Sequence, residues 1–222
     1  MYRSLVGSLI YLTHTRPDIV NAVSIVSRFM SEPSKDHLTA AKRILRYIKG
    51  TKSYGIMYET EKFFKLTGYT DSDWAGSVDD RKSTSGYVFQ LGNKVVSWSS
   101  KKQATVALSS AEAEYIAATS AAREAVWLRR VLIDLQHKQE TPTTMFCDNM
   151  STIAMTKNPV FHIRSKHIEI RHHYIRELVD KKEIELQFCK MGEQLADIFT
   201  KPISTDRFID FRRRLRVQEF SD

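Results

Sequence analysis

Cysteines are scarce in this 222-residue chain, and long apolar runs are absent. Cys147 and Cys189 are the only two cysteines, they do not form a Cys-x-x-Cys pair, and each lies in an apolar stretch. This usage favours reduced core thiols over a disulfide framework. No apolar run approaches the roughly 20 residues that a membrane span needs, and the N-terminus lacks a signal-peptide pattern. We therefore expect an intracellular protein, cytoplasmic or nuclear, with no membrane partner.

Composition indicates a globular chain with a basic balance. Hydrophobic residues make up 42% of the sequence, which is ample for a core, and there are no internal repeats or low-complexity linkers. Lysine and arginine total 34 against 26 acidic residues, giving a net charge of +8. Such a balance favours a polyanionic partner through counterion release, although many basic proteins bind no nucleic acid.

The first 52 residues show helical periodicity. Helices are predicted over Leu5–Leu12, between Pro17 and Met30, and over Ser34–Lys49, with Pro33 and Gly50 as stop signals. No carboxylate cluster falls within them. We expect a small helical packing module here.

After Gly50 the pattern changes to short β-rich runs followed by alternating helices and strands. The first four strands are predicted at Tyr54–Tyr58, Lys65–Thr70, Thr84–Leu91 and Val95–Ser99, with a hairpin turn at Gly92-Asn93. Helices are then predicted at about 110–135, 150–157, 165–179 and 194–200, alternating with strands at 143–147 and 183–189. This order predicts an α/β domain over residues 53–205, a mixed sheet with helices on its faces. Residues 206–222 are expected to form a basic C-terminal tail.

Four acidic residues stand at the edges of four different predicted elements: Asp71, Glu114, Asp148 and Asp197. Brought together, they would form a carboxylate site of the kind that suits Mg²⁺ and phosphodiester hydrolysis. Each aspartate also has a purely structural interpretation. Asp71 could form a turn, Asp148 could cap a helix, and Asp197 could complement a helix dipole. Because all of these would have to hold at once, we favour the metal site.

Spacing separates the two glutamates of the long helix. Glu112 lies three residues after Ser109, which fits a capping box in which Glu112 reaches back to the serine N–H. Glu114 has no such role and shares its face with a stripe of alanines, which predicts a close approach to the sheet. A carboxylate packed there without a cation or partner is unfavourable. We therefore choose Glu114 as the ligand.

The residues from about Lys65 to Pro202 resemble the ribonuclease H domain of copia-type LTR retrotransposon Pol polyproteins. The motifs that carry this resemblance are Thr70-Asp71-Ser72-Asp73-Trp74-Ala75-Gly76, Asp80-Arg81-Lys82-Ser83-Thr84-Ser85-Gly86-Tyr87, Ser97-Trp98-Ser99-Ser100-Lys101-Lys102-Gln103, Leu108-Ser109-Ser110-Ala111-Glu112-Ala113-Glu114-Tyr115 and Ala196-Asp197-Ile198-Phe199-Thr200-Lys201-Pro202. Residues 2–12 and 15–19 resemble the helical tail that follows the reverse-transcriptase palm in the same polyprotein.

The resemblance implies a ribonuclease H-like, five-stranded mixed sheet and a Mg²⁺-dependent endonuclease that cuts the RNA strand of an RNA–DNA hybrid. It implies two Mg²⁺ ions, with Mn²⁺ as an alternative, held by Asp71, Glu114, Asp148 and Asp197, with Asp71 bridging them. The reverse-transcriptase portion of the polyprotein is the implied protein partner. Contacts to 2′-hydroxyls would select RNA.

Candidate nucleic-acid contacts are less specific. Arg81, Lys82, Lys101, Lys102 and Asn149 are predicted to contact phosphate or a 2′-hydroxyl, with solvated basic loops and a helix N-terminal asparagine as the structural alternatives. Trp74 and Trp98 could stack on the nucleic acid or pack in the core.

Two features depart from a complete ribonuclease H. The loop 190–193 lacks the histidine that many family members carry, so His162, His167, His172 and His173 are considered in its place. The chain also lacks palm, integrase and protease motifs, which indicates a C-terminal fragment of an element. Two alternatives remain open: a non-catalytic nucleic-acid-binding remnant, and an integrase-like strand transferase, which the order of the acids disfavours.

Overall fold

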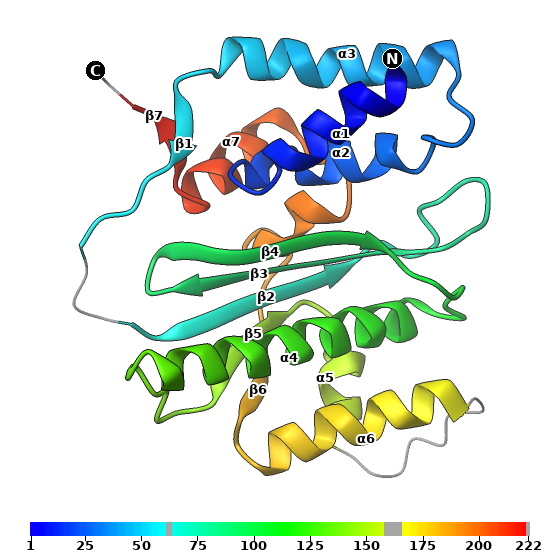
Figure 1. Cartoon of the computed structure of the whole chain (residues 1–222). Helices are drawn as coiled ribbons and strands as arrows, with labels where there is room; N and C mark the ends of the chain where they lie inside the picture. Colours follow the sequence, from blue (N-terminus) through cyan, green and yellow to red (C-terminus); the bar gives the residue numbers. More distant parts are fainter. Residues whose placement is uncertain (61–63, 158–165, 221–222) are drawn as a thin grey trace. The chain divides into compact units, whose positions relative to one another are not determined.

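The computed structural model describes residues 1–60, 64–157 and 166–220 (Figure 1), without the side chains of 166–172. It divides into two compact units. Unit 1 contains residues 1–60, 93–95 and 202–222, and unit 2 contains residues 61–92 and 96–201. The domain boundaries predicted after residues 52 and 205 stay predictions. No helix in the described ranges is long and apolar enough to cross a membrane.

Unit 1 is built from helices and one small sheet. Its elements are α1 (Tyr2–Leu12), the 3₁₀ helix η1 (Pro17–Ile19), α2 (Val20–Ser27), α3 (Lys35–Gly50), β1 (Tyr54–Ile56), α7 (Thr205–Arg214) and β7 (Val217–Glu219). Apolar side chains of α1, α2 and α3 form its core, as the periodicity predicted. The residues expected to be a basic tail form α7 and β7, and β7 pairs antiparallel with β1.

A buried polar network fixes the turn before η1 to the end of α3. The Arg16 guanidinium makes a bidentate ion pair with Asp18, with N–O distances of 2.9 and 2.7 Å. Arg16 also donates to the Thr51 carbonyl at 3.0 Å, and the Tyr47 hydroxyl donates to Asp18 at 2.7 Å. Each buried charge is therefore paired and hydrogen-bonded.

Unit 2 is the predicted α/β domain with a five-stranded mixed sheet in the order β4-β3-β2-β5-β6 (Figure 1). The strands are β2 (Leu66–Ser72), β3 (Thr84–Leu91), β4 (Lys94–Lys102), β5 (Thr143–Cys147) and β6 (Ile184–Phe188). β2 pairs antiparallel with β3 and parallel with β5, and β5 pairs parallel with β6. The predicted two-residue turn joins β3 to β4, with Gly92 at a φ of 65°. This sheet confirms the expected ribonuclease H-like fold.

Helices α4 (Ser110–Asp134), α5 (Met150–Lys157) and α6 (Lys166–Asp180) lie on one side of this sheet (Figure 1). The buried alanines of α4 let it approach β2 and β3 closely, and Phe89 of β3 belongs to the same apolar core. Side chains alternate between the two faces of a strand, so Gly86 lies on the face of β3 opposite to Phe89. There it meets the 3₁₀ helix η2 (Leu195–Phe199), which lies within the helix predicted at about residues 194–200.

Candidate metal centre

Asp71 lies near the end of β2, in the middle of the sheet. It is paired with Gly86 of β3 and is 1% exposed. The Thr200 hydroxyl donates a hydrogen bond to its carboxylate, and Lys201 Nζ lies 3.4 Å from the same oxygen. Asp71 is therefore held inside the protein by polar partners, which is not the environment of a solvated turn residue.

Glu114 enters the site from the second turn of α4. The Ser109 side chain caps this helix by accepting from the Glu112 N–H at 3.1 Å, as predicted. The Glu112 carboxylate accepts from the Leu108 N–H at 2.9 Å, so the expected bond to the Ser109 N–H is wrong by one residue. Glu112 is thus a capping residue at the surface, which leaves Glu114 as the inward carboxylate.

The environment of Glu114 disfavours its charged form. Glu114 is 5% exposed and accepts a hydrogen bond from the Ser72 N–H at 3.1 Å. Burial, followed by the charges of Asp71 and Asp148, raises the pKa of Glu114 well above its usual range. A cation among these carboxylates would remove that repulsion.

Asp148 follows β5 at the same edge of the sheet. Burial raises its pKa, Lys201 opposes this shift, and Asp197 adds to it. The helix-capping role that Asp148 could have had belongs to Asn149, whose Oδ1 accepts from the Thr152 N–H at 3.0 Å. The structural alternative considered for Asn149 is therefore present, and its contact with nucleic acid stays a prediction.

Asp197 is fully buried in η2. The buried Gln194 side chain positions this helix, because its Nε2 donates to the Thr70 carbonyl at 3.0 Å and its Oε1 accepts from the Ala196 N–H. Gln194 thereby ties η2 to β2, the strand that carries Asp71.

The four acids predicted from the sequence meet at one end of the sheet. Asp71, Asp148 and Asp197 each place a carboxylate oxygen within 4.8 Å of the others. Glu114 and Asp148 form a second such group with the Cys147 thiol. Carboxylate oxygens are the donors that Mg²⁺ prefers, so this donor set fits the expected cation.

Cys147 is a neighbour of the centre and is poorly suited to bind Mg²⁺. It is buried with no disulfide, as is Cys189, and its Sγ lies 4.0 Å from Glu114 Oε2. Burial, together with the charge of Glu114, raises the pKa of the Cys147 thiol well above its usual range. A protonated soft donor does not compete with carboxylates for a hard cation.

Lys201 is a residue of the centre that the sequence argument missed. Its ammonium lies 2.8 Å from Asp197 and 3.4 Å from Asp71, and the side chain is 34% exposed. Burial alone would lower the pKa of Lys201, but the charges of Asp71, Asp197 and Asp148 outweigh it and raise the pKa. The signal was available in the i, i+4 spacing between Asp197 and Lys201.

The four basic residues predicted to contact nucleic acid differ in whether they form ion pairs within the protein. Asp80 forms ion pairs with Lys102 at 2.8 Å and with Lys82 at 3.8 Å. The hydrogen bond from Lys102, above all, lowers the pKa of Asp80 to about 2. Arg81 is exposed and has a φ of 55°, and Lys101 is exposed on β4. No ion pair of Arg81 or Lys101 occurs within the described part of the chain, so these two cations are open to an anionic ligand.

The aromatic and histidine candidates stay largely untested. Trp74 is 58% exposed, which is compatible with stacking, and Trp98 is half-buried. His173 is exposed on α6. His162 and the side chains of His167 and His172 lie outside the described residues.

Known proteins are similar in sequence to nearly the whole of this chain. No known family profile matches it. A Pol polyprotein from transposon RE1 of Arabidopsis thaliana is 44% identical over 97% of the chain. The chain spans 15–16% of the length of three such plant polyproteins. The secreted RxLR effector protein 161 of Plasmopara viticola is 52% identical over 57% of the chain and 90% of that protein.

Solved structures give a weaker likeness. The crystal structure of LC11-RNase H1 in complex with an RNA/DNA hybrid is 13% identical, with a TM-score of 0.45 over 61% of this chain and 94% of that one.

Proposed function

The chain belongs to the copia-type retrotransposon Pol polyproteins and carries their ribonuclease H region, and we propose that it hydrolyses the RNA strand of RNA–DNA hybrids. The observation that carries this proposal is the meeting of Asp71 of β2, Glu114 of α4, Asp148 of the loop after β5 and Asp197 of η2. One or two of them could be structural, but four at one sheet edge form a site for divalent cations.

In this proposal Asp71, Glu114, Asp148 and Asp197 hold Mg²⁺, with Mn²⁺ as an alternative. The chemistry that these ions supply when bound is activation of a water nucleophile and stabilisation of the leaving oxygen. The protein supplies the preorganisation. The Thr200 hydroxyl fixes the carboxylate of Asp71, and the Ser72 N–H fixes that of Glu114. Held in this way, the ligands need little rearrangement when substrate binds.

Substrate recognition is proposed to rest on two properties of the hybrid. Its phosphates would meet the exposed cations near the site, among them Arg81 and Lys101. Its wide minor groove displays the 2′-hydroxyls that distinguish the RNA strand from DNA. The reverse-transcriptase portion of the polyprotein is the proposed partner that delivers the hybrid.

The decisive experiment is cleavage of a labelled RNA–DNA hybrid by the purified chain with Mg²⁺ or Mn²⁺, with duplex DNA as a second substrate. Asp71→Asn should abolish cutting, because it removes a buried ligand. Glu112→Gln is the matched control, since Glu112 only caps α4, and it should keep cutting. Cutting of duplex DNA with equal efficiency would contradict hybrid specificity. Hybrid binding without cutting, by a folded protein with either metal, would replace the enzyme by a non-catalytic nucleic-acid-binding remnant.

A further inference from the structure

The buried side chain of Gln103 connects two of the elements that carry the four acids. Its Nε2 atom donates to Ser72 Oγ at 3.2 Å, and Ser72 follows Asp71 on β2. The same atom donates to the Ala113 carbonyl at 3.0 Å, and Ala113 precedes Glu114 on α4. One amide group therefore joins the neighbours of two proposed metal ligands.

Gln194 makes the same kind of connection between β2 and η2. Its Nε2 atom donates to the carbonyl of Thr70, the residue before Asp71. Its Oε1 atom accepts from the N–H of Ala196, the residue before Asp197. Asp71 thus lies between two residues that are each bonded to a buried glutamine, and each glutamine leads to a different ligand.

The orientation of the Gln103 amide is fixed by its partners. A backbone carbonyl only accepts hydrogen bonds, so the Nε2 atom has to face the Ala113 carbonyl. The backbone N–H of Gln103 donates to the Ser83 carbonyl at 2.7 Å, and Ser85 Oγ accepts from Nε2 at 2.9 Å. The side chain is therefore bonded to β2, β3 and α4 at once, and it cannot turn without breaking these bonds.

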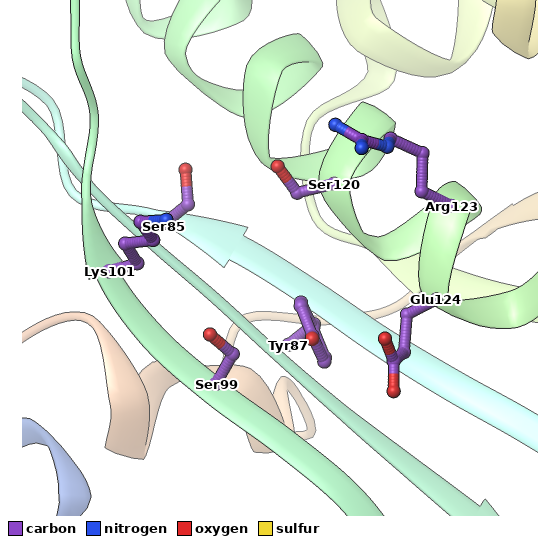
Figure 2. A pocket seen from close by; sticks show the side chains of 7 residues that line it. All are labelled: Ser85, Tyr87, Ser99, Lys101, Ser120, Arg123 and Glu124. Atoms are coloured by element: carbon purple, nitrogen blue, oxygen red, sulfur yellow. The ribbon is translucent and has the colours of Figure 1, made fainter. Parts of the chain in front are cut away.

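Apolar packing does not extend along the whole of the contact between α4 and the strands β3 and β4. A pocket of about 420 Å³ lies between the helix and these strands, and Ser85, Tyr87 and Ser120 are among the residues that line it (Figure 2). Ser85 thus belongs both to the wall of this pocket and to the partners of Gln103. Where the helix and the strands stand apart, a polar bridge such as Gln103 sets a separation that packing leaves open.

The Oε1 atom of Gln103 is an unsatisfied buried acceptor. It has no hydrogen-bond partner in the part of the chain that the structure describes. A buried acceptor without a partner lowers stability, and an apolar side chain of similar size would avoid this loss. The bonds made by Nε2 are therefore the property that requires an amide at this position.

We propose that Gln103 is a positioning residue of the metal centre, which sets the distance between Asp71 and Glu114. This inference rests on the proposed function, since it concerns the same acids. Gln103 acts through the neighbours of these ligands, because a shift of its amide would move β2 relative to α4. Loss of a partner that orients metal ligands typically weakens metal binding by about 10–100-fold.

The test measures metal binding in the absence of nucleic acid. Free Mn²⁺ is followed by electron paramagnetic resonance while the purified chain is titrated. Gln103→Met keeps a side chain of similar length without the amide, and it should raise the Kd for Mn²⁺ about tenfold. Gln139→Met is the matched control, because the Gln139 amide binds the Leu66 N–H and the Phe64 carbonyl at the other end of β2. It should stay within about twofold of the wild type.

Hybrid cleavage separates positioning from a general loss of stability. At limiting Mg²⁺, Gln103→Met should lower kcat about tenfold and leave KM within about twofold, because no contact with the substrate is removed. The difference from the wild type should shrink as the Mg²⁺ concentration rises. A smaller folded fraction would instead lower the rate by the same factor at every Mg²⁺ concentration, and circular dichroism measures that fraction.

Ser72→Ala is the second variant, for the case in which Gln103→Met does not fold. It removes one acceptor of the Gln103 amide and leaves the glutamine in place. Mn²⁺ binding should weaken about threefold, the effect of one net hydrogen bond.

Each outcome decides the inference. If the folded variant binds Mn²⁺ as tightly as the wild type, or if Gln139→Met loses as much affinity, the positioning role is wrong while the proposed function stands. If the wild type binds Mn²⁺ but cuts no hybrid, the proposed function fails, and the Mn²⁺ affinities of the variants still decide the positioning role. If the wild type binds no Mn²⁺, the positioning role is overturned together with the metal site.

Discussion

The ammonium group of Lys201 lies 2.8 Å from the carboxylate of Asp197 and also reaches Asp71, at 3.4 Å. A lysine of the protein thus stands among the carboxylates that we propose as metal ligands. It balances part of their charge, and it also occupies space that a divalent cation would need.

Lys201→Met should lower the metal-free stability and strengthen Mg²⁺ binding. Loss of the partly buried ion pairs is expected to reduce the free energy of unfolding by about 1–2 kcal/mol in EDTA. Because the competing cation is gone, Mg²⁺ should restore more stability to the variant than it adds to the wild type. Thermal unfolding with EDTA and with a Mg²⁺ series measures both effects. Lys190→Met, at an exposed site, should change neither, and a deficit in Lys201→Met that Mg²⁺ leaves untouched would contradict the idea.

Glu114→Gln should stabilise the metal-free protein in a pH-dependent way. The pKa of Glu114 is raised by folding, so the stability it contributes is complete below its ordinary value of 4.5 and is lost as the pH rises toward the folded pKa. Glutamine imitates the protonated form at every pH. The advantage of the variant should therefore grow from about pH 4.5 upward, by at most about 1.4 kcal/mol per pH unit.

Thermal unfolding in EDTA between about pH 4 and pH 8 measures this advantage. Glu112→Gln is the control, because Glu112 lies at the surface as a helix cap. A constant offset between Glu114→Gln and the wild type over the whole pH range would show that the buried carboxylate is not the cause.

Gly86→Ala should disturb the centre through packing alone. A Cβ at this position would lie 2.7 Å from Thr200 Cγ2 and 2.8 Å from Phe199 Cβ, so η2 would have to move away from β3. We expect a loss of about 1–3 kcal/mol in unfolding free energy. Hybrid cleavage should fall by at least tenfold, because Asp197 moves with η2.

The matched control for Gly86→Ala is Gly192→Ala, where an added Cβ meets nothing within 4 Å. Its stability should stay within about 0.5 kcal/mol of the wild type. Equal behaviour of the two variants in thermal unfolding and in cleavage would argue against a close contact between β3 and η2.

Asp18→Asn should loosen unit 1 without touching the metal centre. The change leaves the buried Arg16 guanidinium without its counter-charge, which should reduce stability by about 3 kcal/mol. Hydrogen exchange of the α3 amides reports on this unit directly. Asp36→Asn, at the exposed first turn of the same helix, should lose less than about 1 kcal/mol. Similar exchange in both variants would mean that the Arg16 network contributes little.

The sequence distinguished the roles of Glu112 and Glu114 because neighbouring residues indicated what each glutamate does. Ser109 identified Glu112 as a cap, and the alanine stripe identified Glu114 as inward, and both inferences agree with the contacts. A helix was predicted around Asp197 without its type, because a five-residue segment carries too little periodicity to distinguish an α-helix from the 3₁₀ helix that the structure has there. Lys201 was missed because only acidic side chains, which can bind a metal cation, were considered as members of the centre.

The C-terminal residues show a different limit. Residues 206–222 were predicted to be a basic tail, although Phe211 and Leu215 lie at helical spacing and are buried. The partner of β7 could not be predicted from the local pattern, because Val217 pairs with Ile56 and all residues of unit 2 lie between these two in the sequence. A three-residue strand can be recognised only when its distant partner strand is known.

The same pairing sets an order for biosynthesis. A ribosome makes chain from the N-terminus, and domains generally fold as they emerge. The residues of unit 2 are therefore all translated before α7 and β7, which belong to unit 1. Until then β1 lacks its partner strand and presents unpaired backbone groups, which are a template for wrong pairing. Unit 1 is therefore completed after unit 2, although α1, α2 and α3 precede unit 2 in the sequence.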